Sequence, residues 1–209
     1  MRNSVTKSLP SLACAAAIAL LLSACASNKA PPATQFDFGP AVATAQAAPS
    51  STLGAVVITD VTGSSALDNE RMFYRLSYAD ALQARTYANS RWTANPLQMM
   101  TQRLKTRIGQ AGAKVLSETD ASLGIPLLRV DVDDFMHDFS GVSQSQGVVA
   151  VRASVFRGHT LVDQKTFTRA TPAATPDAAG GARALAASTD AIAADITGWL
   201  GTLNLQQPR

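Results

Sequence analysis

Side chains that could carry chemistry are scarce in this sequence of 209 residues and fall into three places. Cys14 and Cys25 lie near the amino end, where a thiolate could act as a nucleophile or accept a modification. Ser143 lies in Gly-Val-Ser-Gln-Ser, which approaches the nucleophile-elbow pattern of serine hydrolases. Four carboxylates and a histidine could together hold a hard cation: Asp131, Asp133, Asp134, His137 and Asp138.

The setting of Ser143 does not favour a catalytic nucleophile. Ser145 stands where the elbow needs its second glycine, and the segment falls between two predicted strands instead of between a strand and a helix. No HExxH, P-loop or dinucleotide-binding glycine motif occurs either. We therefore predict a polar hairpin loop and a protein that is not an enzyme. An envelope esterase acting through Ser143 is the alternative.

The acidic segment resembles a strand more than a metal loop. Asp131 and Asp133 alternate with Val130 and Val132, and the spacing is not that of an EF-hand. Arg152 on the next predicted strand could pair with these carboxylates. The pattern predicts a solvated strand face and no metal or other cofactor, with a weak Ca²⁺ site as the alternative.

The amino end has the organisation of an export signal. Arg2 and Lys7 precede an apolar run from Leu12 to Leu22, which as a helix would be roughly 16 Å long, about half the thickness of a hydrocarbon core. Leu22-Ser23-Ala24-Cys25 closes the run and resembles the bacterial lipobox, whose cysteine is acylated after cleavage. We predict a signal peptide over 1–24 and lipidation of Cys25, with an ordinary secretory signal as the alternative.

Three expectations follow from this processing. Several acyl chains on Cys25 form a durable membrane anchor, and Ala26 after it favours the outer membrane in the usual sorting rule. The mature chain then has no free thiol. Loss of Arg2 and Lys7 leaves 16 Lys and Arg side chains against 15 Asp and Glu, so the apparent basicity largely disappears.

The remaining positive charge is concentrated between Arg71 and Lys114. This segment holds eight basic residues and one acid, Asp80. It could meet lipid phosphates or an acidic partner, or it could be dispersed solubilising charge, with Arg103 and Arg107 flanking the wet side of a helix. Nucleic acid is not an expected partner because the chain is exported and has no recognisable stacking motif.

The mature chain divides into a tether over 25–52, with a short strand near 36–38, and a domain over 53–205. A continuous β-branched and apolar run predicts a buried strand at 53–61. Further strands are predicted at 72–76, 82–87, 113–117, 128–133, 149–155 and 161–168, most of them from alternating apolar residues. Asn95 and Asp177 begin two predicted helices, the first ending at Gly112. The fold class is α+β: a single domain with a largely antiparallel sheet covered by two main helices.

Phe135, Met136 and Phe139 are apolar residues near the tip of a predicted hairpin. Two interpretations stay open for them. They tuck under the loop, or they form an apolar contact surface.

The order of several short motifs resembles the ABC-type transport auxiliary lipoprotein family, which includes the lipoprotein of the paraquat-inducible system. The resemblance rests on Phe36-Asp37-Phe38-Gly39-Pro40, Leu67-Asp68, Phe73-Tyr74-Arg75, Tyr87, Arg91-Trp92, Pro96 and the terminal Asp-Ile-x-x-Trp-Leu at 195–200. It covers nearly the whole mature chain. The Arg-Trp-x-x-x-Pro segment at 91–96 is its most specific part.

The resemblance implies an outer-membrane docking component without ATPase activity. Its partners would be an ABC transporter and a mammalian-cell-entry-type protein that move lipids or other hydrophobic compounds between membranes, with a bound lipid or a homo-oligomer as further expectations. We expect Arg75, Tyr87, Arg91 and Trp92 to form the distinctive contact surface, although Trp92 could simply pack behind the helix start. A stand-alone lipid or solute carrier and a purely structural envelope lipoprotein are the alternatives.

Overall fold

A long antiparallel meander forms the spine of the domain. It consists of β7 (Leu127–Gly141), β8 (Gln144–Arg157) and β9 (Thr160–Pro172), each paired with the next. Alternate side chains of β8, such as Val149, Val151 and Val155, are fully buried, as the period-two pattern predicts. Gly158, with a φ of +59°, makes the turn between β8 and β9.

The rest of the sheet is assembled along the opposite edge of β7. The antiparallel hairpin of β4 (Arg71–Arg75) and β5 (Ala84–Trp92) joins its carboxyl-terminal half through a parallel β4–β7 pairing. The short strands β2 (Ala55–Ile58), β3 (Thr62–Gly63) and β6 (Lys114–Ser117) lie toward its beginning. The result is one nine-stranded sheet among the described residues.

The computed structural model describes residues 32–42, 53–120, 123–203 and 205. The predicted signal peptide, Cys25 and most of the tether therefore lie outside the described residues. Within them, the predicted α+β class is confirmed, and the strand near 36–38 is found slightly earlier as β1 (Thr34–Phe36). The sheet is mixed, because β1, β2, β3, β4 and β6 all make parallel pairs.

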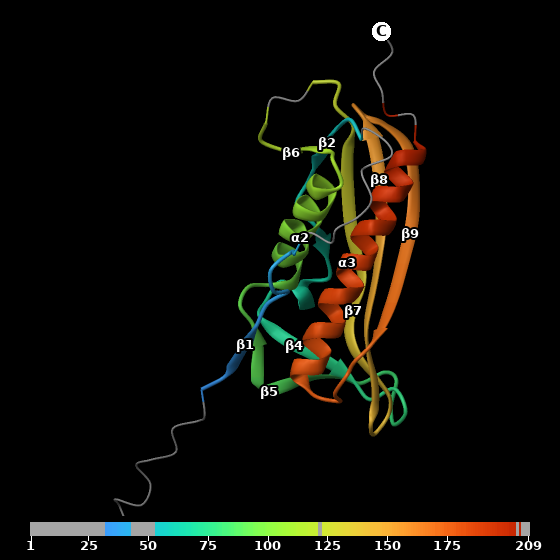
Figure 1. The fold of residues 1–209 in the computed structure, drawn as a ribbon. Helices are drawn as coiled ribbons and strands as arrows, with labels where there is room; N and C mark the ends of the chain where they lie inside the picture. Colours follow the sequence, from blue (N-terminus) through green and yellow to red (C-terminus); the bar gives the residue numbers. More distant parts are fainter. Residues whose placement is uncertain (1–31, 43–52, 121–122, 204, 206–209) are drawn as a thin grey trace, which may run out of the picture. The chain divides into compact units, whose positions relative to one another are not determined.

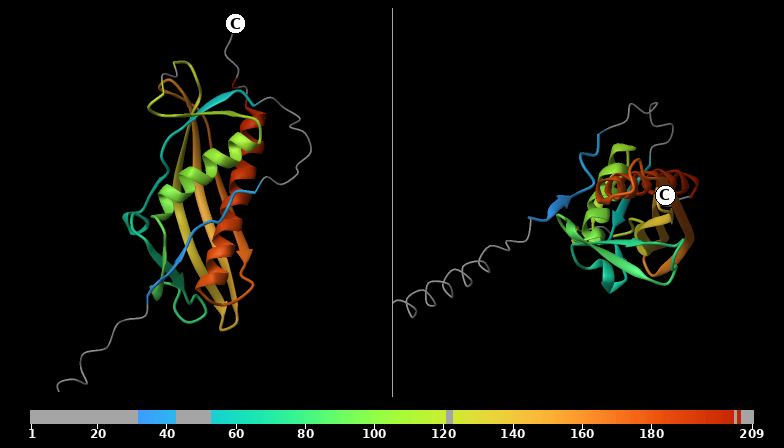
Figure 2. Two further views of the ribbon diagram at one scale, coloured as in Figure 1. Left: turned by 60° about the vertical axis from the view of Figure 1, so that its left-hand side comes forward. Right: turned by 90° about the horizontal axis from the view of Figure 1, so that it is seen from below.

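Two helices cover one face of this sheet and pack beside each other (Figures 1 and 2). α2 (Pro96–Gln110) begins at Asn95, whose side chain accepts a hydrogen bond from the Gln98 amide at 2.8 Å. α3 (Ala178–Thr202) begins at Asp177, which accepts from the Gly180 amide at 2.7 Å. A single-turn helix, η1 (Ser65–Leu67), precedes β4.

The three apolar residues near the β7–β8 tip belong to the core. Phe135 is 4% exposed, Phe139 7% and Met136 9%. Phe135 contacts Trp92, and Phe139 lies 4.5 Å, between ring centroids, from His137. Of the two interpretations of these residues, packing inside the domain is the one that the structure confirms.

Glycines in α3 and β8 allow the helix to approach the sheet closely. A Cβ at Gly181 would lie 2.3 Å from Nδ1 of His137, and a Cβ at Gly147 would lie 2.4 Å from the backbone nitrogen of Leu185. Neither distance is compatible with an alanine unless the layers move apart. These two positions set the spacing between α3 and the meander.

We predict opposite effects for two Gly→Ala substitutions in α3. Gly181→Ala should lower the free energy of unfolding by about 1–3 kcal/mol, because overpacking outweighs the gain in helix propensity. Gly198→Ala, whose Cβ would meet nothing within 4 Å, should raise it by up to about 1 kcal/mol. Urea unfolding followed by circular dichroism measures both. Equal effects of the two substitutions would contradict the close approach at Gly181.

Candidate docking and anchoring site

Residues 33–42, called the strap below, connect the folded domain to the segment that precedes it. β1 pairs in parallel with the end of β5, with Thr34 opposite Ser90 and Phe36 opposite Trp92. The Thr93 amide donates to the Phe36 carbonyl at 2.8 Å and closes this pairing. The strap then leaves the sheet and crosses the helices (Figure 2).

Phe38 attaches the strap to the core. Its ring lies 5.7 Å from Trp92 and 6.1 Å from Phe135, measured between centroids. Gly39, with a φ of +65°, turns the chain immediately afterward, and the side chain of Asp37 accepts its amide hydrogen at 2.7 Å. In the Phe-Asp-Phe-Gly segment, the Phe38 ring thus packs against the core, and Asp37 and Gly39 form the turn that follows.

Two arginines of α2 hold the strap from the other side. Arg103 donates to the carbonyls of Phe38 and Gly39. Arg107 donates to the Val42 carbonyl at 2.7 Å, and Gln110 donates to the Ala41 carbonyl at 2.8 Å. Residues 38–42 are therefore hydrogen-bonded to α2 through their backbone.

Asp190 of α3 pairs with both arginines. Its carboxylate accepts two hydrogen bonds from Arg107, at 2.9 and 2.6 Å, and lies 3.4 Å from Nε of Arg103. The hydrogen bonds that Arg107 donates to Asp190 raise the pKa of Arg107. Burial lowers the pKa of Arg103, and the charge of Asp190 opposes that shift. Residues Arg103, Arg107 and Asp190 are called the clamp below.

The clamp corrects one prediction. Arg103 does not flank the wet side of α2, because the residue is only 5% exposed. The helical spacing 100, 103, 104, 107, 108 places Arg103 and Arg107 beside the buried residues Met100, Leu104 and Ile108. The edge of that apolar stripe faces α3, so both guanidinium groups meet Asp190 instead of water.

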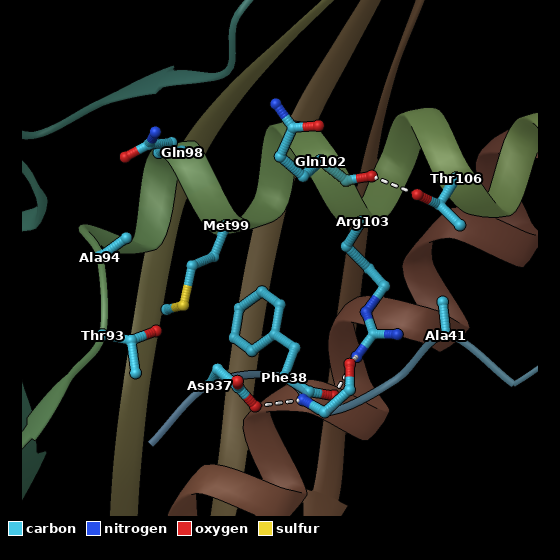
Figure 3. A pocket seen from close by; sticks show the side chains of 11 residues that line it. Asp37, Phe38, Ala41, Thr93, Ala94, Gln98, Met99, Gln102, Arg103 and Thr106 are labelled. Atoms are coloured by element: carbon cyan, nitrogen blue, oxygen red, sulfur yellow. Dashed lines mark hydrogen bonds between the residues drawn. The ribbon is translucent and has the colours of Figure 1, made fainter. Parts of the chain in front are cut away.

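Two shallow hollows flank the strap. One, of about 350 Å³, lies between the strap and α2 and is lined by Phe38, Met99 and Arg103 among others (Figure 3). The other, of about 290 Å³, lies between the strap and the first turns of α3. Both are open to solvent and near the lower limit of ligand pockets, so they could hold a small apolar group but do not enclose a lipid.

The four predicted contact residues all lie on the β4–β5 hairpin, but they do not share one surface. Arg91 is exposed, whereas Trp92 is 1% exposed and packs between Phe38 and Phe135. Of the two roles considered for Trp92, packing is therefore the one that its position supports. Arg75 is half-buried opposite Asp138 of β7, and its Nε has no hydrogen-bond partner among the described residues.

Tyr87 points inward, toward His137. The Tyr87 hydroxyl lies 2.8 Å from Nδ1 of His137, and its ring is 4.6 Å from that of Tyr74. Burial raises the pKa of Tyr87 and lowers the pKa of His137 to about 4. A neutral imidazole therefore shares one hydrogen bond with the tyrosine hydroxyl through Nδ1, while its buried Nε2 has no partner in the described part of the chain.

The acidic segment and the basic segment are both divided among separate contacts. Asp131 pairs with Arg152 at 2.6 Å and accepts from Thr62, Asp138 accepts from Ser77, and burial raises the pKa of Asp134. The predicted Asp131–Arg152 pair is thus confirmed. Among the basic residues, Arg103 and Arg107 belong to the clamp and Lys105 lies 3.8 Å from Asp60, so each of these three has an acidic partner.

Ser143 lies at the turn between β7 and β8, in the tight loop that the sequence predicts. Neither histidine is near it: His137 is six residues earlier on β7 and fully buried. The described residues contain no group of three or more His, Cys, Asp or Glu side chains placed to hold a metal ion. Among those residues, no helix is both long and apolar enough to cross a bilayer.

The described part of the chain is thus a domain whose amino-terminal strap is held by β5 and α2, with an open hollow on each side of the strap. Its sequence matches the model of a family described as the ABC-type transport auxiliary lipoprotein component over residues 36–197, and the chain belongs to this family. The family is one of lipoproteins, so the protein is a membrane-anchored, periplasm-facing accessory of ABC-type transport rather than a member of a catalytic family.

Solved structures share the fold at low sequence identity. A Xanthomonas campestris protein of family DUF330 is 19% identical with a TM-score of 0.70, over 81% of this chain and 95% of that one. An uncharacterized protein is 13% identical with a TM-score of 0.64, over 81% of this chain and 99% of that one. No curated protein matches the sequence.

We predict that Asp190→Asn destabilises the domain by about 1–3 kcal/mol, because it leaves the buried Arg103 without its counter-charge. Asp195→Asn in the same helix is the matched control. Its partner Arg169 is exposed, so its loss should change the urea midpoint little. Asp190→Asn should also speed proteolysis within the strap. Identical midpoints for the two variants would contradict a supporting role of the clamp.

We predict that stability depends on pH through His137. The unfolded imidazole titrates near 6.5 and the folded one near 4, so the unfolded state binds the proton first as the pH falls. The free energy of unfolding should therefore decrease between about pH 6.5 and 4, by up to about 3 kcal/mol in total.

Urea unfolding at several pH values in this window tests the His137 prediction. His137→Asn should be less stable at pH 7.5 and should show a shallower decline toward pH 4.5. Asp134 titrates in both proteins, so the difference between the two curves isolates His137. Tyr87→Phe, which keeps the imidazole, should retain the steep decline. Parallel curves for the wild type and His137→Asn would contradict the prediction.

Proposed function

We propose that this protein is an outer-membrane docking component, acylated on Cys25, of a transport system built from an ABC transporter and a mammalian-cell-entry-type protein. In this role it helps to move lipids or other hydrophobic compounds between membranes without catalysing a reaction. The family match over residues 36–197 carries the proposal. Leu-Ser-Ala-Cys at 22–25 supports the anchor, and Ala26 supports the outer membrane.

The geometry of the strap supports an anchoring function. Eight peptide steps separate Cys25 from Ala33, so an extended chain holds the start of the strap within about 29 Å of the acylated residue. From Phe36 onward the strap is fixed by β5, by Phe38 and by the clamp. A domain attached in this way stays close to its membrane while it meets a partner.

Arg91 is the best candidate for a partner contact among the four predicted residues. It is exposed on β5 beside the strap, where β1 places Gln35 opposite it. Tyr87 and Trp92 support the same hairpin from inside, and Arg75 lies near its other end. We therefore assign the docking role to the outer surface of β5 around Arg91.

One preparation from membranes tests the anchor and the partner together. Wild-type protein should sediment with outer membranes, show the mass of a triacylated Cys25, and retain a mammalian-cell-entry-type protein. Cys25→Ser should move to the soluble periplasmic fraction. Arg91→Glu should remain in the membrane but lose most of the partner, because a charge reversal removes the attraction and adds repulsion.

Lys114→Glu is the matched control, since Lys114 is an exposed basic residue on β6, which lies at the opposite end of the strand order from β1 and β5. It should retain the partner at the wild-type level. Unchanged recovery with Arg91→Glu would exclude the proposed contact. An unmodified residue 25 in the wild type would exclude the lipid anchor.

A further inference from the structure

Three large apolar side chains are exposed at one end of the domain. Leu82 is 95% exposed, Val142 80% and Tyr78 48%. Tyr78 and Leu82 lie in the loop between β4 and β5, and Val142 lies at the turn between β7 and β8. These three residues are called the apolar tip below.

The sheet topology brings the two loops together. β4 and β7 run parallel, with Arg75 opposite Asp138, so the loops that follow both strands emerge at the same end (Figure 1). The Tyr78 amide donates to the Phe139 carbonyl at 3.3 Å, and the Ser77 hydroxyl donates to Asp138. The apolar tip is therefore presented by two loops that are hydrogen-bonded to each other.

The strap begins at this same end. β1 runs parallel to β5, so the chain before Thr34 points in the direction of the start of β5 and its loop, although Thr34 itself pairs with Ser90 in the last part of that strand. Both side views show the beginning of the strap near the end of the domain that carries the β7–β8 turn (Figures 1 and 2). Eight peptide steps connect Cys25 to Ala33, so an acylated Cys25 keeps the start of the strap within about 29 Å of the membrane. At this distance the apolar tip can contact the same membrane.

We propose that the apolar tip rests in the headgroup region of the phospholipid surface that holds Cys25. This inference rests on the proposed acylation, which supplies the tether. Leu82 and Val142 bury apolar surface there, and Tyr78 places an aromatic ring with a polar hydroxyl at the depth that tyrosine prefers. The domain is then oriented, with the β2–β6 end directed away from the membrane.

The charges around the apolar tip favour an apolar contact over an electrostatic one. Asp80 accepts the amide hydrogen of Leu82, and Arg85 donates to Gln83, so one charge of each sign flanks the loop. Arg75 and Asp138 oppose each other behind it. Binding to zwitterionic phosphatidylcholine should therefore be about as strong as binding to an anionic surface, with little dependence on salt.

Depth-dependent fluorescence tests the proposal. The mature chain with Cys25→Ser carries a hexahistidine tag in front of residue 25 and is held on phosphatidylcholine vesicles that contain a nickel-chelating lipid. A polarity-sensitive dye on Leu82→Cys should become several-fold brighter on the vesicles and should be quenched by lipids brominated near the headgroup. The same dye on Leu123→Cys is the control, because Leu123 is fully exposed before β7, roughly 45 Å away at the other end of that strand.

Two further variants locate the contact. Val142→Asp in the Leu82→Cys background should remove most of the increase, whereas Leu161→Asp, at an exposed position of β9, should not change it. If the dye at position 82 is no brighter on the tethered protein than in solution, the proposal is wrong. The apolar tip would then be a candidate contact surface for a protein partner. Because the tag replaces the acyl chains, this result is independent of whether Cys25 is acylated.

Discussion

A single carboxylate, that of Asp190, joins three parts of the molecule that are far apart in the sequence. It pairs with Arg103 and Arg107 of α2 from its position on α3, and these arginines in turn bind the backbone of residues 38–42. A guanidinium as buried as that of Arg103 is costly without such compensation. The position of α2 against α3, and the path of the strap over both, therefore depend on this one interaction.

The clamp explains how a short tether can be mechanically useful. A peptide attached only at a chain end would let the domain move freely about its anchor. In this protein the aromatic contact of Phe38 and the hydrogen bonds of Arg103 fix the chain over several residues after β1. Tension on the tether is therefore borne by the sheet and by both helices.

Local patterns predicted the elements well because each pattern has one physical cause. Asn95 and Asp177 cap the two helices as their side chains require, and alternating valines identify β7 and β8 because one face of each strand is buried. The parallel pairing of strands could not be predicted in this way, since the direction of a neighbouring strand does not change the alternation of buried and exposed residues. The mixed character of the sheet had to come from the structure.

The clamp and the imidazole of His137 were missed for a related reason. Arg103 and Arg107 were interpreted as a wet face because arginine is usually exposed, although their spacing placed them beside Met100 and Leu104. His137 was grouped with acidic residues of its own strand, whereas its real neighbours are Tyr87 and Gly181. Both sites depend on residues at least 40 positions away, and single-sequence periodicity contains no information about such contacts.

The two ends of the domain have different surfaces, and this difference bears on how a docking lipoprotein can work. The loop before β5 and the β7–β8 turn carry the exposed residues Tyr78, Leu82 and Val142, whereas Arg91 lies near the other end of β5, where Gln35 of β1 pairs with it. If the apolar tip faces the lipid, Arg91 is separated from it by most of the length of β5 and lies on the part of that strand that the strap itself fixes. A partner bound at Arg91 would then contact the strand and the strap together, while the apolar tip stays with the lipid.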